Sequence, residues 1–144
     1  MTKAQAADLR AKNGYGGMTT LERVLQLHGQ FRQNLEPLRV TPLQAAVLLF
    51  LRRHPEAKVT DAADALVVRV PTISDVLKDL VRKRWVTKRR SVSDTRVVHI
   101  QLSRRGHALV LQIEERVPQV NATLAEEERK ALGITPKNHT APRL

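Results

Sequence analysis

The stretch from Pro71 to Leu102 restricts the fold of this chain most, because it joins an amphipathic helix to a strongly basic β-hairpin. The helix is predicted to begin at Pro71, where the missing N–H group costs no hydrogen bond. Apolar residues recur along it at helical spacing and predict one buried face, formed by Ile73, Val76, Leu77, Leu80 and Val81. The other face is polar, with Thr72, Ser74, Asp75, Lys78 and Arg82. We expect this second face to be exposed.

Two short strands with a polar tip are predicted after the helix. Trp85–Lys88 and Val97–Leu102 alternate as half-buried strands do, and residues 91–96 between them are mostly polar. Basic residues crowd the start of this hairpin: Arg82, Lys83, Arg84, Lys88, Arg89 and Arg90. An exposed polar helix beside a basic hairpin is the arrangement of a winged helix-turn-helix that binds DNA.

The positive charge of the chain is concentrated in this region. The 144 residues carry a formal net charge of +11, and residues 69–105 hold eleven Lys or Arg against three Asp, a net of +8. Such a local excess favours a polyanionic partner, here double-stranded DNA.

Other classes of function are disfavoured by what the sequence lacks. There is no cysteine, which excludes disulfides, thiol sensing and Cys-ligated zinc. The five histidines are widely separated, so we expect neither a metal nor a cofactor. Hydrolase and kinase signatures are absent, and we do not expect an enzyme. No apolar run reaches 18 residues and no signal peptide is visible, which predicts a cytoplasmic protein without membrane segments.

Two helices are predicted before the basic region. The first runs from Thr19 or Thr20 to about Leu35, with an apolar stripe wide enough to contact both its own domain and a second subunit. The second has Thr41 as its N-cap and continues to Arg53. Residues 58–60 are predicted to add a short strand and a cap, and residues 61–66 a small helix whose turn leads into the Pro71 helix. Two helices joined in this way match the helix-turn-helix pattern.

Two helices are predicted after the hairpin. Ser103 caps a long one that runs towards Val117, and Pro118 is expected to kink or interrupt it. Residues 124–129 form a short last helix with acidic residues in its first turn, and Gly133 ends it. The predicted fold class is therefore mainly α with a small β-hairpin (α+β), a winged helix-turn-helix with flanking dimerisation helices.

The predicted organisation is an N-terminal arm over residues 1–17, one domain over 18–133 with its DNA-binding core at 41–103, and a tail over 134–144. Within the arm, residues 3–12 permit a short helix. Gly14, Gly16 and Gly17 invite comparison with a phosphate-binding loop, but no strand precedes them and the third glycine of a dinucleotide fingerprint is missing.

Four short motifs carry a family resemblance through their order and spacing. They are Thr41-Pro42-Leu43-Gln44, Leu80-x-x-Lys83-x-Trp85-Val86, Asp94-x-Arg96 and Leu102-Ser103-x-x-Gly106. Over about residues 19–132 the chain resembles the MarR (multiple-antibiotic-resistance regulator) family of bacterial winged helix-turn-helix repressors. The resemblance implies a homodimer on a pseudo-palindromic operator, with the recognition helix in the major groove and the wing arginine in the minor groove. It also implies release of DNA on binding a small, frequently phenolic ligand.

The pattern and the resemblance together assign candidate site residues. The recognition helix is predicted to contact DNA through Pro71, Thr72, Ser74, Asp75, Lys78 and Arg82. The wing is predicted to do so through Lys88, Arg89, Arg90, Ser93, Asp94 and Arg96. Dimerisation is assigned to Leu21, Val24, Leu25, Leu109, Ile113 and Val117. A candidate ligand pocket is assigned to Leu25, His28, Phe31 and Phe50, which fit a plain core equally well, and Trp85 is expected to be a core residue that anchors the wing.

The sequence departs from the family pattern in four places. Arg84 replaces the usual glycine after the recognition helix, a position often in the left-handed region, and the turn at residues 67–70 also lacks its glycine. Asp75 stands where a DNA-contacting arginine is common; a carboxylate repels phosphate but accepts a hydrogen bond from cytosine N4. The last helix is short, which leaves the strength of the dimer open.

Two alternatives remain at this level. Arg96 is equally able to pair with Asp94 and simply close the turn, an exposed pair that adds little stability. The domain is also compatible with a winged-helix module that binds protein or RNA without operator specificity. Trp85 is the only aromatic residue in the basic region, which argues against single-stranded RNA.

Overall fold

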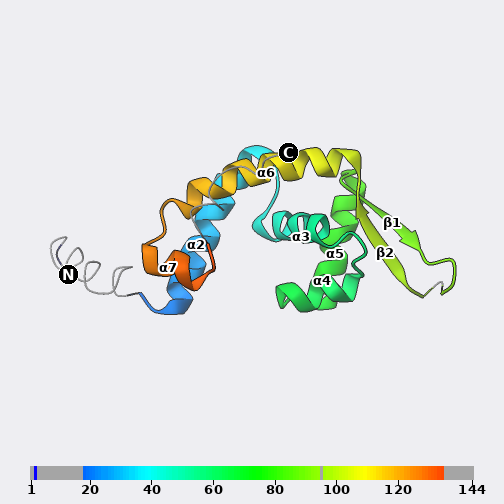
Figure 1. The fold of residues 1–144 in the computed structure, drawn as a ribbon, viewed down its shortest axis with the longest axis horizontal. Coiled ribbons are helices and arrows are strands. Elements are labelled where there is room, and N and C mark those ends of the chain that lie inside the picture. Colours follow the sequence, from blue (N-terminus) through cyan, green and yellow to red (C-terminus); the bar gives the residue numbers. More distant parts are fainter. Residues whose placement is uncertain (1, 3–17, 95, 135–144) are drawn as a thin grey trace. The chain divides into compact units, whose positions relative to one another are not determined.

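The computed structural model of the chain describes residues 2, 18–94 and 96–134 (Figure 1). In chain order its elements are α2 (Thr20–Leu35), the 3₁₀ turn η1 (Glu36–Leu38), α3 (Pro42–Arg53), α4 (Val59–Leu66), α5 (Val70–Arg82), β1 (Val86–Arg90), β2 (Val98–Leu102), α6 (Arg104–Asn121) and α7 (Glu126–Ala131). The predicted mainly α fold with one antiparallel hairpin is confirmed. The predicted helix at residues 3–12 and the glycines at 14–17 lie outside the described residues.

Contacts divide the chain into two compact units. We call residues 35–114 the central unit, and the described parts of residues 1–34 and 115–144 the terminal unit. The predicted DNA-binding core, residues 41–103, lies inside the central unit.

The core of the central unit is built on α3. Val47 and Leu48 of this helix are completely buried, as expected from its nearly continuous apolar run. They belong to a set of buried apolar side chains from α5, the hairpin and the first half of α6: Ile73, Leu77, Leu80, Val86, Ile100, Val110 and Ile113. The apolar face predicted for the Pro71 helix is therefore largely confirmed, although Val76 and Val81 stay half-exposed.

Side-chain caps fix the helix starts where the sequence predicts them. Thr41 Oγ1 accepts from Gln44 N at 3.1 Å, and Gln44 Oε1 accepts from Thr41 N at 3.0 Å, so both halves of the predicted capping box of α3 are present. At the start of α6, Ser103 Oγ accepts from Gly106 N at 3.0 Å. Capping of this kind contributes about 1 kcal/mol to a helix.

Two local predictions are wrong. Only Lys58 takes part in a strand-like bridge, to His99, and α4 already begins at Val59, because Asp61 Oδ2 accepts from Lys58 N at 2.9 Å and closes the first turn there. Pro118 does not interrupt α6, which continues to Asn121, so the predicted interruption is wrong, while the alternative, a kink, stays a prediction. The carbonyl of Pro118 even accepts from Ala122 N at 2.9 Å, so the helical pattern carries on past it.

Three elements of the central unit end in the same way without glycine. Arg39, Val67 and Arg84 follow η1, α4 and α5 with φ of 59°, 53° and 63°, and each donates its N–H to the carbonyl three residues earlier. At the end of α7 the same joint is made by Gly133, with φ of 71°. Arg84 thus adopts the left-handed conformation that is often found at this position of the family pattern, so the turn does not differ here. A residue with a Cβ atom pays roughly 1–2 kcal/mol for this conformation, and β-branched Val67 is the least suited of the three.

Replacing Val67 with glycine is expected to raise the free energy of unfolding by about 1 kcal/mol, the relief of left-handed strain less the larger entropy of glycine in the unfolded chain. The Val67 side chain is 91% exposed, so its removal gives up little packing. Val92→Gly is the matched control, because Val92 is fully exposed but has no positive φ. Chemical denaturation of the three proteins tests this. A Val67→Gly variant as destabilised as Val92→Gly would contradict it.

The terminal unit is held by polar contacts between α2, α6 and α7. Arg23 of α2 binds Glu128 of α7 through two hydrogen bonds, Nε–Oε2 at 2.6 Å and Nη2–Oε1 at 2.9 Å, and the two side chains are only 12% and 13% exposed. Asn34 Nδ2 donates to Arg116 O and to Gln119 Oε1, both at 3.1 Å. The hydrogen bond from Arg23 lowers the pKa of Glu128 below its usual value.

Acid is expected to loosen α7 from α2. Because the folded state lowers the pKa of Glu128, the ion pair with Arg23 contributes fully to the free energy of unfolding above the pKa of Glu in the unfolded chain, about 4.3. This contribution is lost as the pH falls through the lower pKa of the folded state. Glu128→Gln should cost about 2 kcal/mol at pH 7 and flatten the pH dependence of thermal stability below about pH 5. Glu127→Gln, an exposed neighbour in the same turn, should change neither. Equal acid dependence in the wild type and Glu128→Gln would show that this pair does not control α7.

Candidate nucleic-acid interface

The way α5 is anchored to the core determines which of its faces is exposed. Arg69 is extended at the N-cap, Pro71 occupies the first turn, and Ile73, Leu77 and Leu80 are completely buried on the inner side. The six residues predicted to contact DNA therefore lie outward. Ser74 is half-buried, and the other five are exposed: Pro71, Thr72, Asp75, Lys78 and Arg82.

A partly buried polar link that sequence reasoning missed fixes the far end of α5. Asp79 accepts a hydrogen bond from Gln44 Nε2 of α3 at 2.8 Å, lies 3.5 Å from Lys83 Nζ and also pairs with Arg82. The spacing of Asp79 to Arg82 (i, i+3) and to Lys83 (i, i+4) could have indicated the two ion pairs from the sequence. The hydrogen bond to Gln44, 35 positions away, has no such local signal. Arg82, predicted to contact DNA, is thus also part of an ion pair, although its side chain remains 77% exposed.

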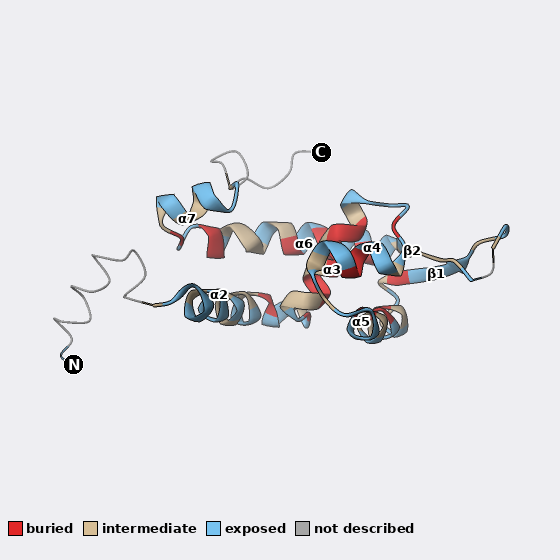
Figure 2. Ribbon diagram, turned by 90° about the horizontal axis from the view of Figure 1, so that it is seen from below, coloured by how far each residue is buried: buried red, intermediate tan, exposed pale blue. Residues whose placement is uncertain are grey.

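Strand β1 of the wing is buried at its base and exposed along the rest of its length (Figure 2). Its register pairs Val86 with Leu102 and Arg90 with Val98. Only Val86 of β1 is buried, against the core. The basic residues predicted in the wing, Lys88, Arg89 and Arg90, all lie on the exposed part of β1. The exposed part of β1 therefore presents a row of cations to solvent. Its partner strand β2 contributes the buried Ile100 to the core.

The tip of the wing holds its arginine by the adjacent aspartate. Asp94 Oδ1 accepts from Arg96 N at 3.0 Å and from Arg96 Nε at 3.2 Å, while the Arg96 side chain remains 89% exposed. These hydrogen bonds lower the pKa of Asp94. Ser93 Oγ and Ser91 Oγ are 2.9 Å apart beside this pair. The predicted pairing of Arg96 and Asp94 is confirmed, and it restrains the direction of an otherwise exposed guanidinium group.

The wing and α6 meet α5 at a tight junction. Ser103 N donates to Trp85 O at 3.0 Å, and Ser103 Oγ donates to Arg84 O at 2.6 Å. A Cβ atom on Gly106 would lie 2.0 Å from Trp85 O, so only glycine fits there. The prediction that Trp85 is a core residue is wrong: it is half-buried, with Lys83 Nζ 5.1 Å from its ring centroid, and the buried anchor of the wing is Val86.

Comparison with known proteins agrees with this arrangement. Residues 40–97 match the family model described as "MarR family". Over this stretch, which spans α3, α4, α5 and β1, the chain is similar to that family.

Individual relatives of this chain are HTH-type transcriptional regulators. It is 25% identical over 120 residues to the HTH-type transcriptional repressor MdtR of Bacillus subtilis, covering 78% of this chain and 76% of that protein. Among solved structures, the S. aureus MepR–DNA complex is 27% identical, with a TM-score of 0.65, and the match covers 81% of this chain and 92% of that one. A mutant MarR from E. coli complexed with operator DNA has a TM-score of 0.69 at 23% identity, covering 87% and 92%, and shows the shared fold. The family model and these relatives support the predicted resemblance and the predicted class, a transcriptional regulator.

The residues predicted to form the dimer divide into two groups by their exposure. Leu21, Val24 and Leu25 lie on α2 with 67%, 54% and 61% exposure. Leu109 and Ile113 are 7% and 0% exposed, so their assignment to dimerisation is wrong: an apolar helix face signals burial but does not say against what. Val117 is half-buried.

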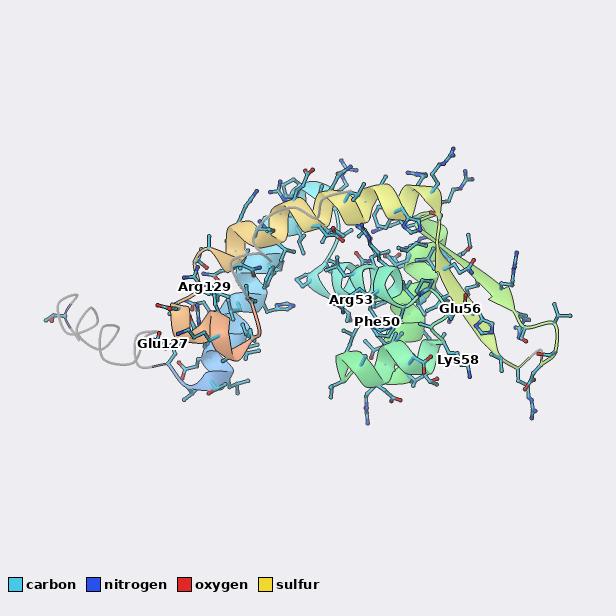
Figure 3. The ribbon with its side chains drawn as sticks, viewed as in Figure 1. Phe50, Arg53, Glu56, Lys58, Glu127 and Arg129 are labelled. Carbon is cyan, nitrogen blue, oxygen red and sulfur yellow. The ribbon has the colours of Figure 1, made fainter. Side chains whose placement is uncertain are left out.

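The residues of the predicted ligand pocket fall in different units. Leu25, His28 and Phe31 belong to the terminal unit, with the first two exposed, and Phe50 belongs to the central unit. Phe50 instead lines a hollow of about 400 Å³ with Arg53, His54, Pro55, Glu56, Ala57 and Asp61. Figure 3 labels Phe50, Arg53 and Glu56 of this set. Its ring centroid is 4.6 Å from that of His54. The predicted pocket remains a prediction.

Across residues 18–94 and 96–134, no three His, Asp or Glu side chains are grouped so as to hold a metal ion. Among the described helices, none is long and apolar enough to cross a membrane.

Proposed function

We propose that this chain is a MarR-family repressor that binds a pseudo-palindromic operator as a homodimer and is released by a small aromatic ligand. The observation that carries the proposal is the combination of an outward polar face on α5 with a wing whose cations are exposed and whose tip arginine is restrained by Asp94. The MepR structure that this chain resembles contains DNA, which supports the same interface. The proposed activity is binding and not catalysis, in the cytoplasm, by the core at residues 41–103.

The proposed division of labour on DNA follows from side-chain chemistry. Thr72, Ser74 and Lys78 approach base edges in the major groove, where recognition helices read sequence. Arg82, Lys88, Arg89 and Arg90 bind phosphates, which set position and carry little sequence information. Arg96 enters the minor groove, whose negative potential attracts arginine.

The exposed apolar residues of α2 support the homodimer. Leu21, Val24 and Leu25 are spaced i, i+3 and i+4 and therefore share one face of the helix, more than half exposed. A second copy of the chain would remove this face from water. Two-fold symmetry would then place the two recognition helices about 34 Å apart, one turn of DNA.

A gel shift against DNA from the region upstream of its own gene tests the proposal, combined with sedimentation of the free protein and the complex. We expect a dimer in both states and a shift that random DNA does not compete away. Binding without sequence preference would favour the alternative, a winged-helix module for RNA or protein. A monomer at micromolar concentration in both states would exclude the homodimer.

Release by a ligand needs its own measurement. Phenolic acids should raise the thermal stability of the free protein and weaken its operator complex, because a ligand that binds only the DNA-free form stabilises that form. If a panel of such acids changed neither quantity, the ligand part of the proposal would be dropped, and operator binding would stand.

A further inference from the structure

One carboxylate lies in the middle of the outward stripe of α5. Pro71, Asp75, Lys78 and Arg82 are spaced i, i+4, i+7 and i+11, so they form one row along the helix, and all four are exposed. Lys78 and Arg82 follow Asp75 in this row, and β1 carries three more exposed cations, so a negative charge here is unexpected for a surface that binds a polyanion.

This carboxylate differs from the other aspartates of the region in having no partner. Asp79, one turn further along, is held by Gln44, Arg82 and Lys83, and Asp94 is held by Arg96. The side chain of Asp75 makes no hydrogen bond or ion pair with any residue in the described part of the chain. It is therefore available to a ligand, and no local structural role accounts for it.

A lone carboxylate has two effects against DNA. It repels phosphate, so it weakens binding to DNA of any sequence. In the major groove it accepts a hydrogen bond from the N4 amino group of cytosine, which recovers the loss only where a cytosine is in reach. A residue that penalises wrong partners in this way contributes to specificity more than to affinity.

We propose that Asp75 is a specificity-determining residue of this chain: it reads a cytosine in each operator half-site and lowers the affinity for other DNA. The inference rests on the proposed operator binding. Lys78 stands three residues on, a rise of about 4.5 Å along the helix, against about 3.4 Å between base pairs. Its ammonium group donates to guanine O6 and N7, so each half-site should hold a cytosine and a guanine within about one or two base pairs.

Selection from a random DNA library tests the proposal with four proteins: the wild type, Asp75→Asn, Asp75→Ala and the control Asp64→Asn. Asp64 is an exposed aspartate of α4, likewise without a side-chain partner among the described residues. Wild type and control should select the same half-site. Asp75→Asn should exchange the cytosine for adenine, because asparagine pairs with adenine N6 and N7. Asp75→Ala should lose the preference at that one position, by about 5- to 100-fold in relative affinity.

Titration of a fixed random duplex supplies the second readout. Asp75→Ala should bind it several-fold more tightly than the wild type, with unchanged thermal stability, because only a repulsive charge has been removed. Unchanged base preferences in both Asp75 variants, or a random-DNA affinity that does not rise, would overturn the inference while operator binding stands. If the wild type itself selects no sequence, the proposed operator function fails.

Discussion

Replacing Gly106 with alanine should lower the free energy of unfolding of the central unit by about 2 kcal/mol or more. The added Cβ would lie 2.0 Å from Trp85 O and 3.2 Å from a methyl group of Leu102. Trp85 O already accepts the hydrogen bond from Ser103 N, so the backbone cannot move away without breaking it. Overpacking into fixed backbone costs at least as much as overpacking a core, about 1–3 kcal/mol.

Thermal and chemical denaturation of Gly106→Ala measure this loss, and the wing should lose its protection from proteolysis in the same variant. Gly29→Ala is the matched control, because its Cβ would meet nothing nearer than the end of the Arg32 side chain at 3.9 Å. Within α2 that change should stabilise the helix by up to about 1 kcal/mol. A Gly106→Ala protein as stable as the wild type would mean that the wing and α6 do not approach so closely.

Removing the three cations of β1 together should weaken operator binding about 100-fold near physiological salt. Each phosphate contact contributes a slope of about 0.9 to the log–log dependence of affinity on salt concentration, so the Lys88, Arg89 and Arg90 triple alanine variant should flatten that slope by about 2.7. Random DNA should be weakened to a similar degree, because phosphate contacts carry little sequence information.

Fluorescence anisotropy at several salt concentrations, on one operator and one random duplex, separates this effect from a change in base reading. The control removes the same charge elsewhere, at the exposed cations Arg32, Arg53 and Lys130. It should change the slope by far less, because these residues lie outside the proposed interface. An equal effect of both triple variants would show that net charge, and not the wing, holds the DNA.

The local signals in the sequence predicted most of the fold. The Thr41–Gln44 pattern located the start of α3, and helical spacing identified the buried face of α5, because caps and periodicity act within a few residues. The hairpin was predicted in the correct place, with its strands shifted by one or two residues. The Leu102-Ser103-x-x-Gly106 motif gained a physical reason only from the structure, which puts Gly106 against the Trp85 carbonyl.

What the sequence did not predict depends on partners distant in the chain. Gln44 and Asp79 are 35 positions apart, and Arg23 and Glu128 are 105 apart, so neither pair has a signal in local spacing. The same limit explains the errors at Leu109 and Ile113. Their apolar character was visible, but the choice between the chain's own core and a second copy is made by tertiary packing.

The three residues in the left-handed conformation, Arg39, Val67 and Arg84, are sites where the stability of the protein can be raised by substitution. They share no hydrogen-bond partner, so the gains from glycine at each should add. None of the three belongs to the residues proposed to contact DNA. A more heat-resistant form of the protein can therefore be built without altering the surface that reads the operator, and it would be the better starting material for crystallising the complex with DNA.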